Sequence, residues 1–319
     1  MALRNVSIDY LKSICIILMV TFHLVYIGDK YPYLKQIVYT FHMPAFLIIS
    51  GYLANLNKGS RQFFSSLLWI FIPYAIMETG YVLMSTVLPI RESIDRLSLP
   101  LLLAKVFIAP LGPYWYLHTL IISYLVCYLT HKIPFASKVS FFIASGICFW
   151  IASETFRLVS MSNAIYFMAG IMIRQCNLNF HSVFRPSCLA VFPLWILCQH
   201  PENLDRYSLA GITITYLSMS ALLWGHGYLP LKIKHILHLI GRNTLAILLF
   251  SPIFTLLSKM LIPLFSYDSS GLSFAGVAVS FVISGCFLIA WSMDKLTLTR
   301  FFCGKRKLWN QFVHFTACQ

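Results

Sequence analysis

Charged side chains are scarce in this sequence. Asp, Glu, Lys and Arg together make up 11% of the 319 residues, and only 10 residues are acidic. Soluble domains carry roughly 25% charged residues, so this composition excludes an ordinary soluble protein. Hydrophobic residues instead account for 59% of the chain, and the mean hydropathy is +0.76. The chain is therefore expected to be an integral membrane protein.

Several motifs of secreted and metal-dependent proteins are also missing. The cysteines form no CxxC pair, which argues against a disulfide framework or a zinc ribbon. The zinc-enzyme patterns HExxH and HxxEH are absent, and the HILH stretch at His235 and His238 is interpreted as one face of an interfacial helix. We expect no metal. Low-complexity linkers and internal repeats are lacking as well, which favours a single domain.

Long apolar runs take the place of these features. A membrane-spanning helix needs about 20 mainly apolar residues. The predicted fold class is all-α, a polytopic integral membrane helix bundle of about ten transmembrane helices with both termini in the cytoplasm. The predicted spans, of which the fifth and seventh are short, are Ile8–Ile27, Gln36–Leu53, Phe63–Leu88, Tyr114–Leu129, Val139–Ile151, Leu158–Ile173, Cys188–Cys198, Tyr207–Trp224, Thr244–Pro263 and Leu272–Trp291.

The distribution of positive charge explains the formal net charge of +14. With the N-terminus in the cytoplasm, cationic residues in the inner segments outnumber those in the outer segments by about two to one, as the positive-inside rule requires. The basicity therefore reflects membrane topology, and no nucleic acid is expected as a partner. The electropositive inner face would attract an anionic cytosolic ligand.

The first apolar run contains two ionisable side chains, Lys12 and His23. An amine inside the bilayer costs roughly 2.5–3.5 kcal/mol on insertion scales, so Lys12 either reaches the interface or has a partner. Eleven residues of helix bring His23 back to nearly the same face, about 16 Å further along. In one interpretation His23 has a functional role. The other makes Lys12 an interfacial anchor and His23 an interhelical hydrogen-bonding residue.

Three further ionisable side chains are predicted at a similar depth, in the outer half of the bilayer. They are His42 in the second span, Glu78 in the third and His118 at the start of the fourth. Ser50 and Gly51 would permit close helix approach, and a proline at position 44 could free a backbone carbonyl. Structural alternatives stay open: Glu78 could neutralise a cation, and His118 could belong to an aromatic belt.

These residues resemble the membrane-bound acyltransferase family 3. The resemblance rests on Asp9, Lys12 and, after ten residues, His23, followed by FHMPAFLIISGYL at 41–53, a form similar to the fucose 4-O-acetylase-like branch. YWYLHTLI (114–121), AIYFMAGIMI (164–173) and IGRNTLAILL (240–249) extend it across most of the chain, from about Arg4 to Leu257. The late segment departs from the family pattern at Leu248 and Ser251, where many relatives carry tyrosine and histidine.

The resemblance implies an enzyme that transfers an acyl group, usually acetyl from acetyl-CoA, to a hydroxyl of a carbohydrate beyond the membrane. The acceptor would be a surface polysaccharide or a lipid-linked sugar, and membrane lipids would surround the chain. A bacterial cytoplasmic (inner) membrane is the expected location. Residues 1–295 would form the membrane acyltransferase domain and residues 296–319 a basic cytoplasmic tail. The alternatives are a secondary transporter or flippase, a scaffold protein and a zinc enzyme.

Each candidate residue then has an expected role. His23 is the expected general base for the acceptor hydroxyl, with His42 as its orienting partner or acid, and Glu78 completes the catalytic group. An acyl-histidine intermediate is the alternative left open. The phosphates of coenzyme A would bind basic residues of the inner face, and the acceptor would bind near the fourth span. The residues expected to bind the acyl donor are Lys12, Arg4, Arg61 and Arg242. Those expected to bind the carbohydrate acceptor are His118, Trp115 and Tyr116. For Arg61 and Arg242, plain positive-inside anchoring is the alternative.

Overall fold

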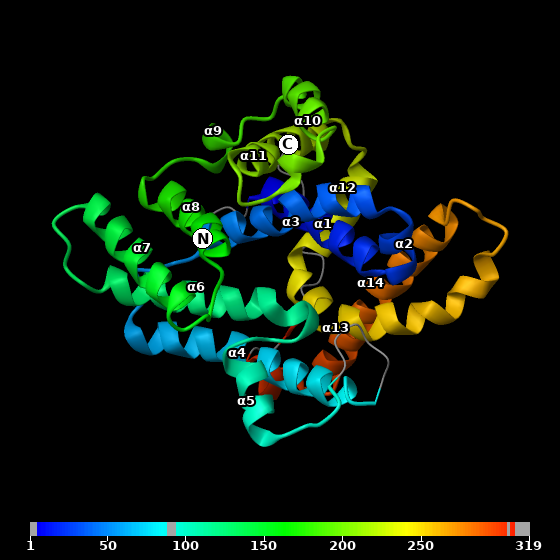
Figure 1. Ribbon diagram of the computed structural model, residues 1–319, viewed down its shortest axis with the longest axis horizontal. Helices are drawn as coiled ribbons and strands as arrows, with labels where there is room; N and C mark the ends of the chain where they lie inside the picture. Colours follow the sequence, from blue (N-terminus) through cyan, green and yellow to red (C-terminus); the bar gives the residue numbers. More distant parts are fainter. Residues whose placement is uncertain (1–4, 88–93, 305–306, 310–319) are drawn as a thin grey trace. The chain divides into compact units, whose positions relative to one another are not determined.

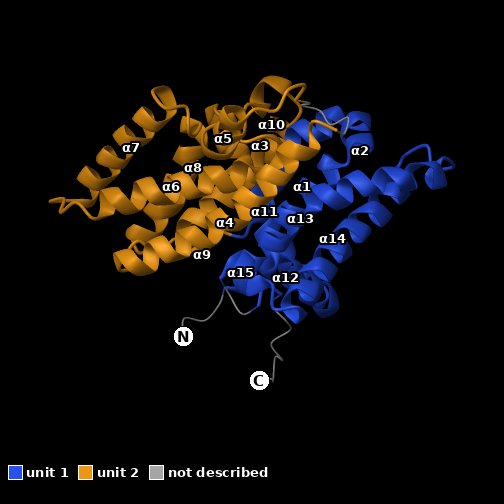
Figure 2. Cartoon of the chain, turned by 90° about the horizontal axis from the view of Figure 1, so that it is seen from below, with its two compact units in different colours: residues 1–38, 186–192, 218–319 blue, residues 39–185, 193–217 orange. Residues whose placement is uncertain are grey.

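The fold was analysed in a computed structural model that describes residues 5–87, 94–304 and 307–309. Helices make up the architecture, and this part of the chain contains no strand, which confirms the all-α prediction (Figure 1). The chain forms two compact units that alternate along the sequence (Figure 2). Unit 1 comprises Met1–Val38, Pro186–Phe192 and Ser218–Gln319, and unit 2 comprises Tyr39–Arg185 and Pro193–Leu217.

Six helical segments of the described chain are long and apolar enough to cross a membrane, judged by length and composition. They are Val6–His23, Pro32–Leu53, Ser60–Met84, Leu99–His131, Thr244–Phe265 and Leu272–Lys295. A polytopic membrane protein is therefore confirmed. Helices also form at the other four predicted spans, but none of them is among these six segments, so the count of ten stays a prediction.

Unit 1 is built around α1 (Val6–His23), which packs against α12 (Leu231–Arg242), α13 (Thr244–Leu257) and α14 (Leu272–Lys295). Helix α1 begins where the Asn5 side chain accepts a hydrogen bond from the backbone N–H of Ser7 at 3.1 Å, a typical N-cap. The remaining elements of this unit are α2 (Val25–Lys30), η4 (Ser258–Phe265) and α15 (Thr299–Cys303).

The first predicted span was expected to be one helix from Ile8 to Ile27, and this was wrong. Helix α1 ends at His23, because Leu24 adopts an extended conformation with φ −66° and ψ 105°. The chain then restarts as α2, with the Leu24 carbonyl accepting the N–H of Ile27 and of Gly28 at 3.0 and 2.9 Å. Gly28 allows this return, since a Cβ there would lie 2.9 Å from the Phe22 carbonyl oxygen. The break leaves His23 at a helix end.

Unit 2 contains the layered helices α4 (Ser60–Met84), α6 (Trp115–His131), α7 (Lys138–Glu154) and α8 (Met161–Gln175), with α6 against the other three. Phe63 stacks on Tyr128 with ring centroids 3.5 Å apart, in a buried aromatic layer. The shorter elements are α5 (Leu99–Phe107), η1 (Gly112–Tyr114), α9 (Phe180–Val183) and η3 (Pro201–Leu204), and η2 (Cys188–Ala190) lies in unit 1. Three elements run from one unit into the other: α3 (Pro32–Leu53), α10 (Val191–Leu197) and α11 (Leu209–Tyr228).

Two glycines let α3 and α8 approach backbone to backbone inside unit 2. A Cβ on Gly51 would overlap the carbonyl oxygen of Phe167, and a Cβ on Gly170 would overlap that of Ile48. The close approach predicted for Gly51 is therefore confirmed. Small residues serve this purpose in membrane helices, where packing rather than the hydrophobic effect drives association.

Replacement of Gly170 by alanine is expected to destabilise unit 2, because the new methyl group has no space at this crossing. Overpacking of this kind costs about 1–3 kcal/mol. Thermal unfolding of the purified protein in detergent measures the loss. Gly146→Ala in α7 is the matched control, since open space surrounds Gly146 and alanine there should be neutral or slightly stabilising. Equal melting temperatures for the two variants would contradict the prediction.

Candidate functional site

His23, the last residue of α1, is held by the backbone of its own helix. Its Nδ1 lies 2.7 Å from the carbonyl oxygen of Met19. A carbonyl oxygen only accepts, so in the neutral imidazole the hydrogen is on Nδ1 and the lone pair is on Nε2. The ring is neither fully buried nor fully exposed. This arrangement orients Nε2 as the nitrogen that can take a proton.

Lys12 lies on the same continuous helix, so the predicted separation of about 16 Å along one face holds. Its Nζ is 2.9 Å from Oδ1 of Asp9, one turn earlier, and Nε of Arg242 in α12 is 3.7 Å from Oδ2 of the same carboxylate. The Asp9 side chain is 4% exposed, and those of Lys12 and Arg242 are 15% and 13% exposed. Lys12 therefore has a partner, as the cost of an intramembrane amine requires.

The cluster of Asp9, Lys12 and Arg242 carries a net charge of +1, because two cations share one carboxylate. Truncating one partner of a buried ion pair is costly, so the cluster holds α1 and α12 in register. Gly241 adds to this contact, since a Cβ there would overlap the Asp9 carbonyl oxygen. The excess charge could attract an anionic ligand to this end of α1.

A histidine pair lies next to this cluster in unit 1. Nε2 of His226, near the end of α11, is 3.1 Å from Nε2 of His238 in α12, and the His226 ring packs on Tyr10 at 4.7 Å between centroids. One imidazole must donate and the other accept, so the pair cannot keep this bond with both rings protonated. Burial, and secondly the His226 imidazole, lowers the pKa of His238 to about 4.

Acidification is expected to destabilise the folded protein through His238. Its pKa is lower in the folded state than in the unfolded chain, where it is about 6.5, so the unfolded chain binds more protons between these values. Stability is then lost as the pH falls from about 6.5 to about 4. The groups that act on His238 are Asp9, which favours its protonation, and His226, Arg242 and His235, which oppose it.

The measurement is the melting temperature in detergent at pH 7.5, 6.5, 5.5 and 4.5. His238→Gln cannot titrate at this position and should show a shallower decline than the parent. His181→Gln, which removes a partly exposed imidazole of unit 2, is the control and should follow the parent curve. Parallel curves for parent and His238→Gln would assign the acid sensitivity to other groups.

In unit 2, Glu78 and His118 meet at the short connection between α5 and η1. The Glu78 carboxylate accepts a hydrogen bond from the backbone N–H of Leu111, and Nε2 of His118 is 3.0 Å from the Phe107 carbonyl oxygen. The Tyr74 hydroxyl donates to the Val106 carbonyl at 2.8 Å. Glu78 and His118 are both buried, at 0% and 4% exposed. Their contacts hold the segment that leads into Trp115, which favours a positioning role for both.

The remaining residues predicted in unit 2 occupy separate places. His42 is 2% exposed and packs against Tyr39 with 5.1 Å between ring centroids. Tyr116 and Ser50 share a hydrogen bond of 2.8 Å between their hydroxyls, which joins α6 to α3. The Trp115 ring contacts the guanidinium of Arg206 at 5.7 Å. The proline at position 44 lies within α3, and the helix continues through it.

The structure brings together only some of the residues predicted to bind the acyl donor. Lys12 and Arg242 share the Asp9 carboxylate, whereas Arg61 is an exposed residue at the start of α4 in unit 2. Arg4 lies outside the described residues. Within those residues, no three His, Cys, Asp or Glu side chains gather as the ligands of a metal ion would.

Sequence reasoning missed two features of the site. Asp9 was noted only as part of a motif, although its spacing of three residues from Lys12 on a helix signals an ion pair. The bond between His226 and His238 had no such signal, because the two residues lie on different helices.

Comparison with known proteins now places the chain in a family. The Acyl_transf_3 family model, described as an acyltransferase domain, matches residues 5–291. The chain therefore belongs to this acyltransferase family. It is also similar to the nodulation protein NolL of Sinorhizobium fredii, with 26% identity over 244 residues that cover 68% of this chain and 63% of NolL. No solved structure matches the chain.

Proposed function

We propose that this protein is a membrane-embedded O-acyltransferase that moves an acyl group, in the simplest case acetyl, from acyl-CoA to a carbohydrate hydroxyl. The observation that carries the proposal is the order of groups along α1. A cluster with excess positive charge lies near one end of the helix, and an imidazole with an oriented Nε2 lies at the other. The family membership supports acyl transfer as the reaction class.

The proposed reaction needs a base because a sugar hydroxyl is a poor nucleophile at neutral pH. Nε2 of His23 takes the hydroxyl proton as the oxygen attacks the thioester carbonyl, which forms the C–O bond of the new ester. The C–S bond then breaks, and the departing thiolate of coenzyme A takes up a proton. His42 is a proposed acid or orienting residue for these steps, and the Met19 carbonyl stabilises the imidazolium form of His23.

The donor is proposed to bind with its phosphates at the cationic end of α1. Lys12 and Arg242 can each form charge-assisted hydrogen bonds to phosphate, and Arg242 presents a planar fork suited to it. The predicted topology places this end at the cytosolic side, where acyl-CoA is found. The acceptor is proposed to approach from the opposite side, at a bacterial cytoplasmic membrane.

Transfer of labelled acetyl groups tests the proposed function. Membranes that contain the protein are supplied with radiolabelled acetyl-CoA and a carbohydrate acceptor, and the label in the purified carbohydrate is measured. An acyltransferase should produce ester-linked label that mild alkali releases and that membranes without the protein lack. Transport of carbohydrate with no label incorporated would instead support the transporter alternative.

A further inference from the structure

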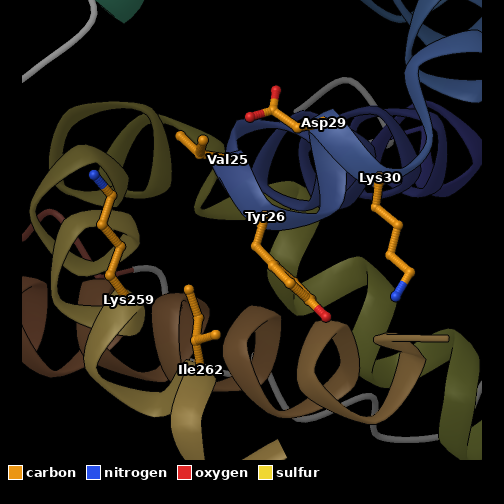
Figure 3. Close-up of a pocket in the computed structure, with 6 residues that line it drawn as sticks. All are labelled: Val25, Tyr26, Asp29, Lys30, Lys259 and Ile262. Carbon is orange, nitrogen blue, oxygen red and sulfur yellow. The ribbon is translucent and has the colours of Figure 1, made fainter. Parts of the chain in front are cut away.

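A cavity opens beside α2, directly after the residue proposed as the base. It has a volume of about 560 Å³ and lies between α2 and η4, both in unit 1 (Figure 3). Helix α2 contributes Val25, Tyr26, Asp29 and Lys30, and η4 contributes Lys259 and Ile262. Pockets of about 300–1,000 Å³ are typical of small-ligand sites, so one or two sugar residues would fit.

The turn at 267–271 fixes one wall of this cavity. The Asp268 carboxylate accepts the backbone N–H of Ser270 and of Ser273, each at 2.8 Å. The Ser270 hydroxyl, which donates to it at 2.6 Å, and secondly the Ser273 backbone N–H hold the pKa of Asp268 well below its usual range. Gly271 is left-handed, with φ 71°, and a Cβ there would lie 2.9 Å from Cε1 of Tyr26. The turn therefore packs closely against the Tyr26 ring.

The same turn anchors α2 at two further points. Nζ of Lys30 donates to the Ser269 carbonyl, and the Tyr31 hydroxyl donates to the Ser270 carbonyl at 2.7 Å. Lys30 also lies over the Tyr26 ring, with Nζ 5.4 Å from the centroid. The wall that presents Tyr26 is thus tied to the turn by two consecutive side chains at the end of α2.

The charge of the cavity is unbalanced toward positive. Its three charged side chains, Asp29, Lys30 and Lys259, are all exposed. Lys30 is engaged by the turn, whereas Lys259 has no hydrogen bond or ion pair within the described parts of the chain. Lys259 also belongs to a segment long and apolar enough to cross a membrane, Thr244–Phe265. A lysine in such a segment is rare and points to a function.

The lining therefore combines an aromatic ring, two aliphatic side chains and an available amine. An aromatic face and aliphatic walls suit the apolar C–H face of a sugar ring, and an amine suits an anionic substituent through a charge-assisted hydrogen bond. The Asp29 carboxylate can accept from sugar hydroxyls. In the predicted topology this cavity opens at the outer end of α1.

We propose that this cavity binds the carbohydrate acceptor as an anionic glycosyl unit. The sugar ring lies against Tyr26, and Lys259 holds a phosphate or carboxylate group of the sugar. The inference rests on the proposed O-acyl transfer and narrows its acceptor to sugars that carry a negative charge. Whether that charge is a phosphate or a carboxylate is decided by the arms of the experiment below.

Direct binding tests the proposal without relying on catalysis. Equilibrium dialysis of the full-length protein in detergent is carried out with labelled glucose 1-phosphate, glucuronate and the neutral methyl glucoside. The parent should bind at least one of the two anionic sugars about tenfold or more tightly than methyl glucoside. Tight binding of glucose 1-phosphate but not of glucuronate would identify phosphate as the recognised group. The opposite preference would identify a carboxylate.

Variants then assign the selectivity to Lys259. Lys259→Gln should lose the tenfold preference, Lys259→Arg should keep it, and Lys232→Gln, which removes an exposed lysine of α12 in the same unit, should match the parent. A preference that survives in Lys259→Gln would overturn the proposal. So would equal binding of the three sugars, or displacement of bound sugar by inorganic phosphate at the same concentration as by glucose 1-phosphate.

The outcome is separable from that of the proposed function. His23→Ala should retain anionic sugar binding, because His23 is not among the residues that line the cavity and would meet only the reacting hydroxyl of the acceptor. Anion-selective binding without labelled ester in the acetyl-transfer assay would support the proposed sugar site and contradict the proposed acyl transfer. Labelled ester without anion-selective binding would support the proposed acyl transfer and contradict the proposed sugar site.

Discussion

Replacement of His23 by alanine is expected to lower acyl transfer by about two to four orders of magnitude, the usual contribution of a general base. The protein should still insert and fold, because His23 is the last residue of α1 and its Nδ1 bonds to a carbonyl of its own helix. The loss should appear in kcat, with little change in the KM for acetyl-CoA, since the imidazole acts on the transferring proton. Initial rates in membranes matched for protein level measure it.

The control for this prediction removes an imidazole elsewhere. His181→Ala changes a partly exposed residue of unit 2 and should leave the rate within about twofold of the parent, as expected for a substitution away from the proposed site. His23→Asn adds a second comparison, because it keeps a polar side chain of similar size but provides no base at neutral pH. Undiminished transfer by His23→Ala would remove the central claim of the proposed mechanism.

Replacement of Lys12 by glutamine is expected to weaken use of the acyl donor by about ten- to a hundredfold. One lost charge-assisted contact is worth roughly 1.5–3 kcal/mol. The change should appear as a higher KM for acetyl-CoA and an unchanged KM for the acceptor, if the amine binds the donor equally in the ground and transition states. Lys12→Arg keeps the charge and should retain much of the activity.

The structure provides a specific alternative role for Lys12, because Lys12 also pairs with Asp9. A purely structural role would reduce the amount of active enzyme, which lowers the apparent kcat and leaves the donor KM unchanged. Arg242 remains beside Asp9 in the variant, so the carboxylate keeps one cation at 3.7 Å. Lys232→Gln is the matched control for loss of a lysine. An unchanged donor KM in Lys12→Gln would make Lys12 a structural ion-pair partner.

Some candidate residues have contacts that explain their burial without a catalytic role. Glu78 and His118 were predicted to join His23 and His42 because all four lie at similar depth. The structure shows Glu78 and His118 bound to backbone groups of Leu111 and Phe107. Depth along a span is predictable from sequence, but the direction of a side chain around its helix depends on the neighbouring helices. A catalytic role for Glu78 stays a prediction, and the contacts favour positioning.

The sequence by itself determined the properties that depend on composition and on local helix geometry. Hydropathy summed over about 20 residues identifies a membrane protein of several helices, and 3.6 residues per turn puts Lys12 and His23 on one face of a helix. The capping of α1 by Asn5 is equally local. These features require no knowledge of which helices touch.

Only the tertiary structure decided the features that join distant parts of the chain. The pairing of Asp9 with Arg242, the bond between His226 and His238, and the cavity between α2 and η4 each bring together separate helices. The break at Leu24 has the same origin, because the restarted helix is tied to the turn at 267–271 through Tyr31. Helix packing in a membrane is set by close fit and by specific polar contacts. The hydropathy of such helices is nearly uniform around and along them. It therefore does not indicate which helices pack together.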